Sequence, residues 1–235
     1  MSLVAEILPD GHAARPLVED VISASERAAG LTRQMLAYAG KGQFVVRPVD
    51  LSEVVRNLSD FFRASVPKRV ELRLQLAPGL PAIEADTSQL QQIVMNLVMN
   101  AAEAIPEGHP GKVEIMTGIK QLEPSAGAAT FLGASPEAGA YALLQIADDG
   151  MGMDEQTLAR IFDPFFTTKF MGRGLGLAAV QGIVRGHRGA LSVESAPGRG
   201  TTFAIFFPAS EAKPALVSES ESAVSPVTPN RSSCR

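Results

Sequence analysis

Two glycine clusters stand on either side of a segment that carries aromatic residues and one lysine. The first is residues 148–152 (DDGMG), which follow an apolar run, and the second is residues 172–176 (GRGLG). Backbone N–H groups at such turns, and at the start of a helix, bind phosphate. A carboxylate at the end of a buried strand can accept a hydrogen bond from an amino group such as that of adenine. The pattern indicates a nucleotide site, with Asp148 at the base end and the glycines and Lys169 at the phosphate end.

A polar stripe runs along the helix predicted for residues 86–104 (DTSQLQQIVMNLVMNAAEA). Most of its residues are apolar, so the helix is expected to be buried. Four polar residues nevertheless share one face, because they recur at spacings of four, four and three: Gln92, Asn96, Asn100 and Glu103. A buried amide without a partner costs about 1–3 kcal/mol. The asparagines therefore either bond to neighbouring backbone, or they face phosphate and Mg²⁺, which favours amide and phosphate oxygens.

Each of these patterns is weak on its own. A DxGxG sequence is often only a turn from a strand into a loop. Residues 174–179 also match the dinucleotide pattern GxGxxA, but residues 167–173 before them do not have the pattern of the buried strand that this motif requires. No GxxxxGK[ST] sequence occurs, so the chain is not a P-loop protein.

Taken in order, four segments resemble the N, G1, F and G2 boxes of the histidine-kinase ATP-binding domain: NLVMNAAEA, DDGMG, FDPFFTTK and GRGLGL. That domain shares the Bergerat (GHKL) fold with gyrase-type topoisomerases, mismatch-repair ATPases and heat-shock chaperones. The resemblance implies an α/β two-layer sandwich, a mixed sheet with helices on one face, over residues 44–208. It also implies a remnant of a dimerisation and phosphoacceptor hairpin over residues 1–43, and a disordered linker or tail over residues 209–235.

The resemblance also assigns roles to residues. Asn100 is expected to coordinate Mg²⁺, Asn96 to support the phosphates, and Lys169 to act with both in catalysis. Asp148 is expected to accept from the adenine amino group. The complete set expected to bind the nucleotide is Asn100, Glu103, Ala104, Asp148, Gly150, Gly152, Met153, Phe165, Thr167, Thr168, Lys169, Gly172, Arg173, Gly174, Leu175, Gly176, Leu177 and Thr201.

Residues 17–38 have the spacing of a helix that packs in a bundle. Apolar residues recur at alternating spacings of four and three for three heptads, from Leu17 to Tyr38. An ordinary amphipathic helix packed on its own domain is the alternative. In the resembled family, this position holds the second helix of the dimerisation and phosphoacceptor hairpin.

The three histidines do not match the phosphoacceptor motif of that family, a histidine followed by an acidic residue on a helix. His12, His109 and His187 all lie in turn-like contexts, and His187 is expected to mark the end of the helix after the second glycine cluster. The chain is therefore expected to be a fragment whose acceptor histidine lies elsewhere, which does not autophosphorylate alone.

The function implied by the resemblance is the ATP-binding catalytic region of a two-component sensor histidine kinase, a phosphotransferase that uses ATP and Mg²⁺. Asn96 stands where hydrolytic relatives keep a base-forming glutamate, which argues against fast ATP hydrolysis. The alternatives are a GHKL-type ATPase, a serine/threonine kinase of the same superfamily, and a nucleotide-binding regulatory module without catalysis. Expected partners are ATP, the helix carrying the phosphoacceptor histidine, a response regulator or receiver domain, and a second copy of the full-length protein.

Composition restricts the remaining possibilities. The net charge is −4, so no nucleic-acid partner is expected. A single cysteine, Cys234, excludes a disulfide within the chain. No apolar run of about 18 residues occurs, so no membrane-spanning helix is expected and a cytoplasmic location is predicted.

Periodicity and turn residues predict the elements of the domain. Apolar alternation predicts a strand over residues 70–76, and apolar runs predict a central strand over 141–147. Further strands are expected at 43–49, 82–85, around 113–115, at 191–194 and at 201–207. Helices are expected at 50–65 and 177–185, and a hairpin loop at 121–139.

Overall fold

The computed structural model describes residues 15, 18, 45–123, 136–169 and 174–210. The predicted helix of residues 17–38 and the tail beyond Ser210 lie outside these residues, Val18 excepted. Seven strands and five helices make up the described domain: β1 (Arg47–Val49), α3 (Leu51–Asn57), α4 (Ser59–Ser65), β2 (Val70–Leu76), β3 (Ile83–Ala85), α5 (Thr87–Ala104), β4 (Gly111–Leu122), β5 (Gly139–Asp148), α6 (Glu155–Leu158), α7 (Gly176–Gly186), β6 (Ala190–Ser195) and β7 (Thr201–Pro208).

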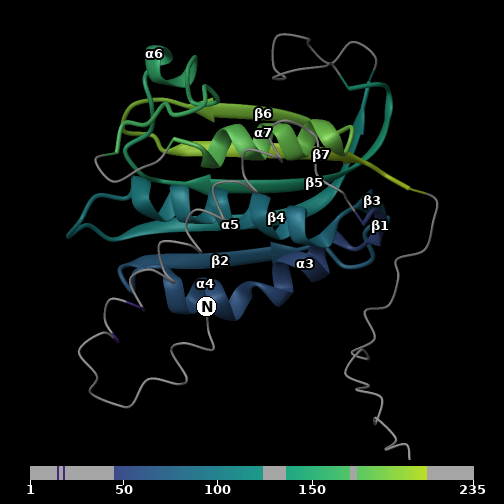
Figure 1. Cartoon of the computed structure of the whole chain (residues 1–235), viewed down its shortest axis with the longest axis horizontal. Helices are drawn as coiled ribbons and strands as arrows, with labels where there is room; N and C mark the ends of the chain where they lie inside the picture. Colours follow the sequence, from purple (N-terminus) through teal and green to yellow (C-terminus); the bar gives the residue numbers. More distant parts are fainter. Residues whose placement is uncertain (1–14, 16–17, 19–44, 124–135, 170–173, 211–235) are drawn as a thin grey trace, which may run out of the picture.

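A five-stranded mixed sheet forms one layer, with the strand order β2-β4-β5-β7-β6. The β2–β4 pair is parallel, and the other pairs are antiparallel. Helices α3, α5 and α7 lie together on one face of this sheet, and a separate pair, β1 and β3, lies at one end (Figure 1). This arrangement confirms the predicted α/β two-layer sandwich.

The core lies between the sheet and the helices. Alternate residues of the central strand point toward the helices, as Ala142, Leu144 and Ile146 are buried. They meet apolar residues of α5 and α7 that are also buried in the same cluster, among them Leu97 and Val180. Burial of this single apolar layer is the main favourable contribution to the stability of the domain.

The predicted helix over residues 50–65 is wrong in one respect, because it is two helices. Asp50 caps the first, and its carboxylate accepts hydrogen bonds from the backbone N–H groups of Ser52 and Glu53. At Leu58 the backbone turns (φ −92°, ψ −6°), and its N–H bonds to Val55 O, three residues back. Helix α4 then starts at Ser59, and its residue Phe62 is fully buried in the core.

The ends of several strands extend further than periodicity indicated. Strand β4 continues to Leu122 and pairs with β5 from Gly139 onward, so the hairpin loop is shorter than residues 121–139. At the other end of the chain, Ala209 N donates to Ala140 O and Ser210 N donates to Ala82 O. These bonds fasten the first two residues of the predicted tail to the domain.

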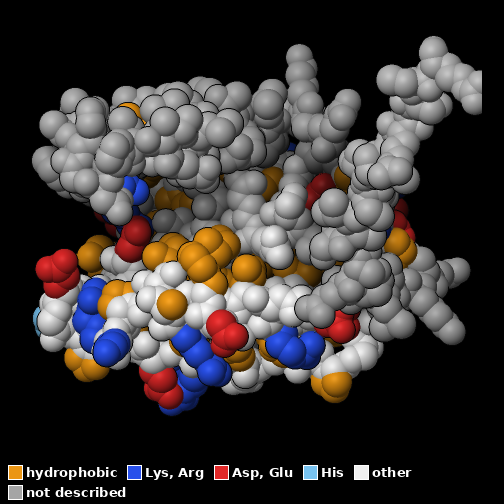
Figure 2. Space-filling view, turned by 60° about the horizontal axis from the view of Figure 1, so that its bottom comes forward, with side chains coloured by type: hydrophobic (Ala, Val, Ile, Leu, Met, Phe, Trp, Pro, Cys, Tyr) orange, Lys and Arg blue, Asp and Glu red, His pale blue; other side chains and the backbone are white. Residues whose placement is uncertain are grey.

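The face that carries β2, α3 and α4 has basic and acidic side chains interspersed, beside small groups of apolar atoms (Figure 2). Arg73 and Glu71 of β2 form an exposed ion pair at 2.8 Å. Among the described residues, no helix combines the length and apolar character needed to cross a bilayer.

Candidate functional site

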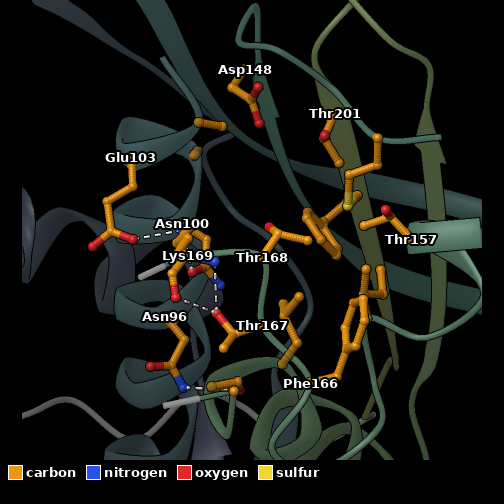
Figure 3. A pocket seen from close by; sticks show the side chains of 18 of the residues that line it. Asn96, Asn100, Glu103, Asp148, Thr157, Phe166, Thr167, Thr168, Lys169 and Thr201 are labelled. Carbon is orange, nitrogen blue, oxygen red and sulfur yellow. Dashed lines mark hydrogen bonds and ion pairs between the residues drawn. The ribbon is translucent and has the colours of Figure 1, made fainter. Parts of the chain in front are cut away.

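A pocket of about 450 Å³ opens between α5, the start of α7, the end of β5 and the segment from α6 to Lys169. Figure 3 shows Asn96, Asn100 and Glu103 along one side, Asp148 and Thr201 at one end, and Phe166 and Thr157 on the opposite side. The volume is in the range of sites for small ligands. Polar groups lie at both ends, and apolar side chains such as Ile161 and Phe203 also line the pocket.

Asp148 is the last residue of the central strand β5, next to Thr201 of β7. Its Oδ1 atom accepts a hydrogen bond from Gly150 N at 2.9 Å. Burial raises the pKa of Asp148 from 3.8 to about 6, although backbone hydrogen bonds from Gly150 and Thr201 act in the opposite direction. A half-buried carboxylate with few protein partners suits a ligand that donates a hydrogen bond to it.

The glycine loop after Asp148 is held between α5 and the β6–β7 hairpin. Met151 N donates to Ala104 O at 3.0 Å, and Met151 O accepts from Gly198 N at 2.7 Å. Gly152 has φ +64°, and a Cβ there would overlap the carbonyl of Ala196. Only glycine fits this position without moving the hairpin.

A charged cluster lies at the other end of the pocket. The Lys169 ammonium donates to Asn100 Oδ1 at 3.2 Å and to Glu103 Oε2 at 2.6 Å. Asn100 and Glu103 belong to α5, whereas Lys169 belongs to the segment that follows α6, and Figure 3 shows the three side chains close together. The side chains of Lys169 and Glu103 are 38% and 52% exposed, so this ion pair is open to solvent and exchangeable.

Helix α7 begins at the pocket. Its N-cap residue Leu175 makes no capping bond with its side chain, so no side chain occupies the N–H groups of the first turn in that way. Asn96 Nδ2 donates to Gly176 O at 3.3 Å and ties α5 to this turn. The start of a helix with free N–H groups attracts anions.

The segment before α7 is closed on itself by Phe165 N, which donates to Gly174 O at 2.8 Å. Phe165 has φ +69°, which is strained for a non-glycine residue, and its side chain is exposed. The next ring, Phe166, lines the pocket and carries the Arg160 guanidinium 4.4 Å from its centroid. This cation–π contact from Arg160 therefore helps to hold the Phe166 ring in place beside the pocket.

Most residues predicted from the sequence meet in this pocket. Those that line it are Asn96, Asn100, Glu103, Ala104, Asp148, Gly152, Met153, Thr167, Thr168, Lys169, Gly174, Leu175, Gly176, Leu177 and Thr201. Gly150 is buried against Ala104 and does not line it, and the exposed Phe165 does not either. Gly172 and Arg173 lie outside the described residues.

Sequence reasoning missed six lining residues: Ala101, Met151, Thr157, Ile161, Phe166 and Phe203. Ala101 directly follows Asn100. A small residue next to the polar stripe could have indicated that a ligand approaches the helix closely at this point. Phe203 lies two residues after Thr201 on the same face of β7. No pattern in the sequence indicated that Thr157 or Ile161 lines a pocket, because the short helix α6, which carries Thr157, was not predicted.

The chain matches known proteins over this whole region. The family model of histidine kinase-, DNA gyrase B- and HSP90-like ATPases matches residues 85–211, more than half of the chain. Sensor kinase CckA of Brucella abortus (strain 2308) is 34% identical over 207 residues, which cover 86% of this chain and 21% of CckA. Sensor histidine kinase ZraS of Escherichia coli (strain K12) is 30% identical over 205 residues, which cover 87% of this chain and 40% of ZraS.

A solved structure gives the same result. The mycobacterial sensor histidine kinase MprB superposes with a TM-score of 0.54 at 29% identity, and the match covers 69% of this chain and 98% of the MprB chain. The chain thus spans less than half the length of the two curated relatives, while its domain corresponds to nearly all of the MprB structure. It belongs to the histidine kinase-, DNA gyrase B- and HSP90-like ATPase family, and its fold is that of the ATP-binding catalytic region of sensor histidine kinases.

Proposed function

We propose that the domain binds Mg²⁺-ATP in this pocket and transfers the γ-phosphoryl group to a histidine of the full-length kinase. The observation that carries the proposal is the pairing of a half-buried carboxylate, Asp148, at one end of the pocket with Lys169 and the start of α7 at the other. A base with an exocyclic amino group suits the first end, and a chain of phosphates suits the second.

At the base end, ionised Asp148 accepts a hydrogen bond from the adenine amino group. Apolar contacts from Met153, Ile161 and Phe203 line the space beside it and would hold the ring. Thr201, also in the pocket, has a hydroxyl that can donate or accept. Guanine presents a carbonyl oxygen where adenine has its amino group, so the carboxylate selects ATP over GTP.

At the phosphate end, Asn100 and Glu103 fit a divalent cation. Their oxygens already converge on a positive charge, the Lys169 ammonium, at 3.2 and 2.6 Å. Amide and carboxylate oxygens are ligands that Mg²⁺ accepts, together with phosphate and water. Asn100 would hold the ion with help from Glu103, and the bound ion would neutralise phosphate charge. Lys169 would then turn toward the phosphates.

The chemistry of the chain itself is positioning and charge stabilisation. The first turn of α7 orients the phosphates with its N–H groups, and Lys169 compensates charge that develops on the transferred group. Among the described residues, Asp148 and Glu103 are the only carboxylates that line the pocket, and Glu103 is paired with Lys169. Asn96 uses its amide on Gly176 O. Among the described lining residues, Asp148 is assigned to the base and Glu103 to the cation, so neither is left to deprotonate a water, which favours transfer over hydrolysis.

The acceptor is proposed to lie on a helix of the full-length protein, beyond the described residues. His187 is buried with both ring nitrogens hydrogen-bonded, and His109 follows the end of α5 in an exposed turn. Neither has a free nitrogen facing the pocket, and His12 lies outside the described residues. A response regulator, a second copy of the kinase and a cytoplasmic location complete the proposal, because CckA and ZraS are named as sensor kinases.

Titration calorimetry with ATP, GTP and AMP, with and without Mg²⁺, tests the binding. Wild type should prefer ATP and need Mg²⁺ for full affinity. Asp148→Ala and Asn100→Ala should each lose about ten- to a hundredfold, the loss expected for a hydrogen bond to a charged group. Equal affinities in all three proteins would exclude this site.

Phosphoryl transfer is tested with labelled ATP. The chain alone should not gain acid-labile label, whereas an added hairpin fragment that carries a phosphoacceptor histidine should be labelled. Rapid release of inorganic phosphate without label on the fragment would support a GHKL-type ATPase in place of the kinase.

A further inference from the structure

His187 lies at the end of α7, as expected, but it is also buried and hydrogen-bonded to another part of the domain. It is 8% exposed, and its ring meets Phe207 edge-on at 6.3 Å. Nε2 accepts a hydrogen bond from Asp86 N at 3.0 Å, and Nδ1 lies 2.8 Å from Ile183 O. Because a backbone N–H only donates and a carbonyl only accepts, the ring hydrogen must be on Nδ1. Both ring nitrogens of His187 are therefore hydrogen-bonded, and Nε2 is bonded to the N-cap residue of another helix, α5.

Asp86 is the residue at which three parts of the domain meet. It is the N-cap of α5, and its Oδ1 accepts from the N–H groups of Ser88 and Gln89. Its Oδ2 accepts from Val45 N at 2.9 Å, just before β1. Its own N–H goes to His187. The incoming segment, the start of α5 and the end of α7 are thus joined through one residue.

The same two helices are tied again by Asn96 Nδ2, in the middle of α5, and Gly176 O, at the start of α7. Asp86 and Asn96 are ten residues apart, about 15 Å along a helix, and Gly176 and His187 are eleven apart, about 16 Å. The order of the partners, Asp86 with His187 and Asn96 with Gly176, shows that α5 and α7 run antiparallel, and the near-equal lengths match α7 to the first half of α5. Figure 1 shows them lying along the same face of the sheet.

Around these two ties the helices contribute buried apolar residues to one cluster, among them Ile93, Leu97, Val180 and Ile183. Close-packed interfaces resist compression and transmit displacement. A shift of α7 along α5 at His187 therefore shifts its first turn as well, where Gly176 and Leu177 line the pocket.

We propose that His187 is a positioning residue for the nucleotide site. By holding the end of α7 on Asp86, it sets the position of the first turn of α7 against Asn96 and Asn100, about 15 Å away along the helix. Through Asp86 it also connects this position to the incoming segment at Val45. This inference rests on the proposed function, in which the first turn of α7 binds the phosphates.

Two variants of the full chain separate positioning from simple loss of packing. His187→Gln keeps an acceptor that reaches Asp86 N, while His187→Asn keeps a side-chain amide that is too short to do so. Ile183 O keeps a hydrogen bond in either variant, because the backbone N–H of residue 187 also donates to it, at 3.1 Å in the wild type. Asp86 N–H is left without this acceptor only in the asparagine variant.

ATP affinity is measured by calorimetry well below the unfolding temperature of each variant. The asparagine variant should bind ATP about fivefold or more weakly, the lower end of coupling between separate sites, and the glutamine variant should stay within about twofold of wild type. Asparagine and glutamine variants with lowered unfolding temperatures but wild-type affinity would overturn the proposal, because the histidine would then only stabilise the fold.

Amide hydrogen exchange without nucleotide gives a second readout that does not depend on ATP binding. Ala179 N, bonded to Leu175 O at 3.0 Å, reports the first turn of α7, and Leu144 N reports the central sheet. In the asparagine variant, exchange at Ala179 should rise at least about fivefold relative to Leu144, and glutamine should restore it. Wild type that fails to bind ATP would refute the proposed function, while a uniform rise at both amides would refute the role of His187.

Discussion

Replacing Asp148 by asparagine is expected to stabilise the nucleotide-free protein above pH 6 and to weaken ATP binding. The carboxylate lies at the end of β5, where burial raises its pKa from 3.8 to about 6. Asparagine has the same shape and keeps an oxygen to accept from Gly150 N. The substitution therefore removes the buried charge while keeping the shape of the side chain and the hydrogen bond from Gly150 N.

The sign of the effect follows from proton linkage. Between pH 3.8 and about 6, the folded protein binds this proton more tightly than the unfolded chain, so stability falls as pH rises through that window. A shift of about 2 pKa units corresponds to about 3 kcal/mol. Because Asp148 is partly open to solvent, we expect about 1–2 kcal/mol. The asparagine variant should show this gain above pH 6 and lose it near pH 4.

Thermal unfolding followed by circular dichroism between pH 4 and pH 8 measures the gain. For a domain of this size, about 1–2 kcal/mol raises the midpoint by about 2–8 °C. Asp149→Asn is the matched control, because Asp149 is the exposed neighbour and its Oδ1 accepts from Lys112 N at 2.7 Å. An asparagine variant of Asp148 that is less stable than wild type at pH 8, or a gain that persists at pH 4, would refute the reasoning.

The same substitution has the opposite effect on ligand binding. A hydrogen bond to a carboxylate is about 1 kcal/mol stronger than one to a neutral oxygen, so ATP affinity should fall about fivefold. The thermal shift produced by saturating ATP should be correspondingly smaller in the variant than in wild type. For wild type, affinity should decline as pH falls below about 6, since protonation removes the negative charge that strengthens this hydrogen bond.

Three further substitutions test other parts of the pocket. Gly152→Ala should lower stability by at least about 2 kcal/mol in thermal unfolding and abolish ATP binding, while Gly118→Ala, with open space around its Cα, should be tolerated. Lys169→Met should weaken ATP about tenfold in calorimetry and leave AMP unchanged, and a loss for both nucleotides would place Lys169 elsewhere. Asn100→Ala should remove the difference between ATP affinities measured with and without Mg²⁺.

The fold was predictable where one pattern dominated the local sequence. Strand β2 alternates apolar and polar residues, and the structure buries or half-buries the apolar set. Helix α5 was marked by Asp86 at its N-cap, and its carboxylate does bond to Ser88 N and Gln89 N. The resemblance of four ordered segments then supplied the architecture that periodicity alone could not.

Tertiary effects account for what sequence reasoning missed. The break at Leu58 has no glycine or proline to mark it in the sequence, and Phe62 in the helix that follows is fully buried. Helix α6 has only four residues and a cap at Asp154, too short for a periodic signal. His187 looked like part of a turn, because its partner Asp86 is 101 residues away in the sequence.

The features of the domain that cost stability are concentrated around one pocket. Asp148 keeps a carboxylate where burial disfavours its charge, and Gly152 needs a backbone conformation that other residues rarely adopt. Asn96 and Asn100 place amides on a helix whose other faces are apolar. Conflicts also occur elsewhere among the described residues, where Arg188 has φ +54° and the buried Nε atom of Arg69 has no hydrogen-bond partner. A folded chain tolerates such conflicts where a ligand resolves them: adenine for the carboxylate, and phosphates with their cation for the amides and the free helix terminus. The location of the conflicts is therefore an argument for nucleotide binding that does not depend on the relatives, and the opposite effects predicted for Asp148→Asn on stability and on affinity put it to the test.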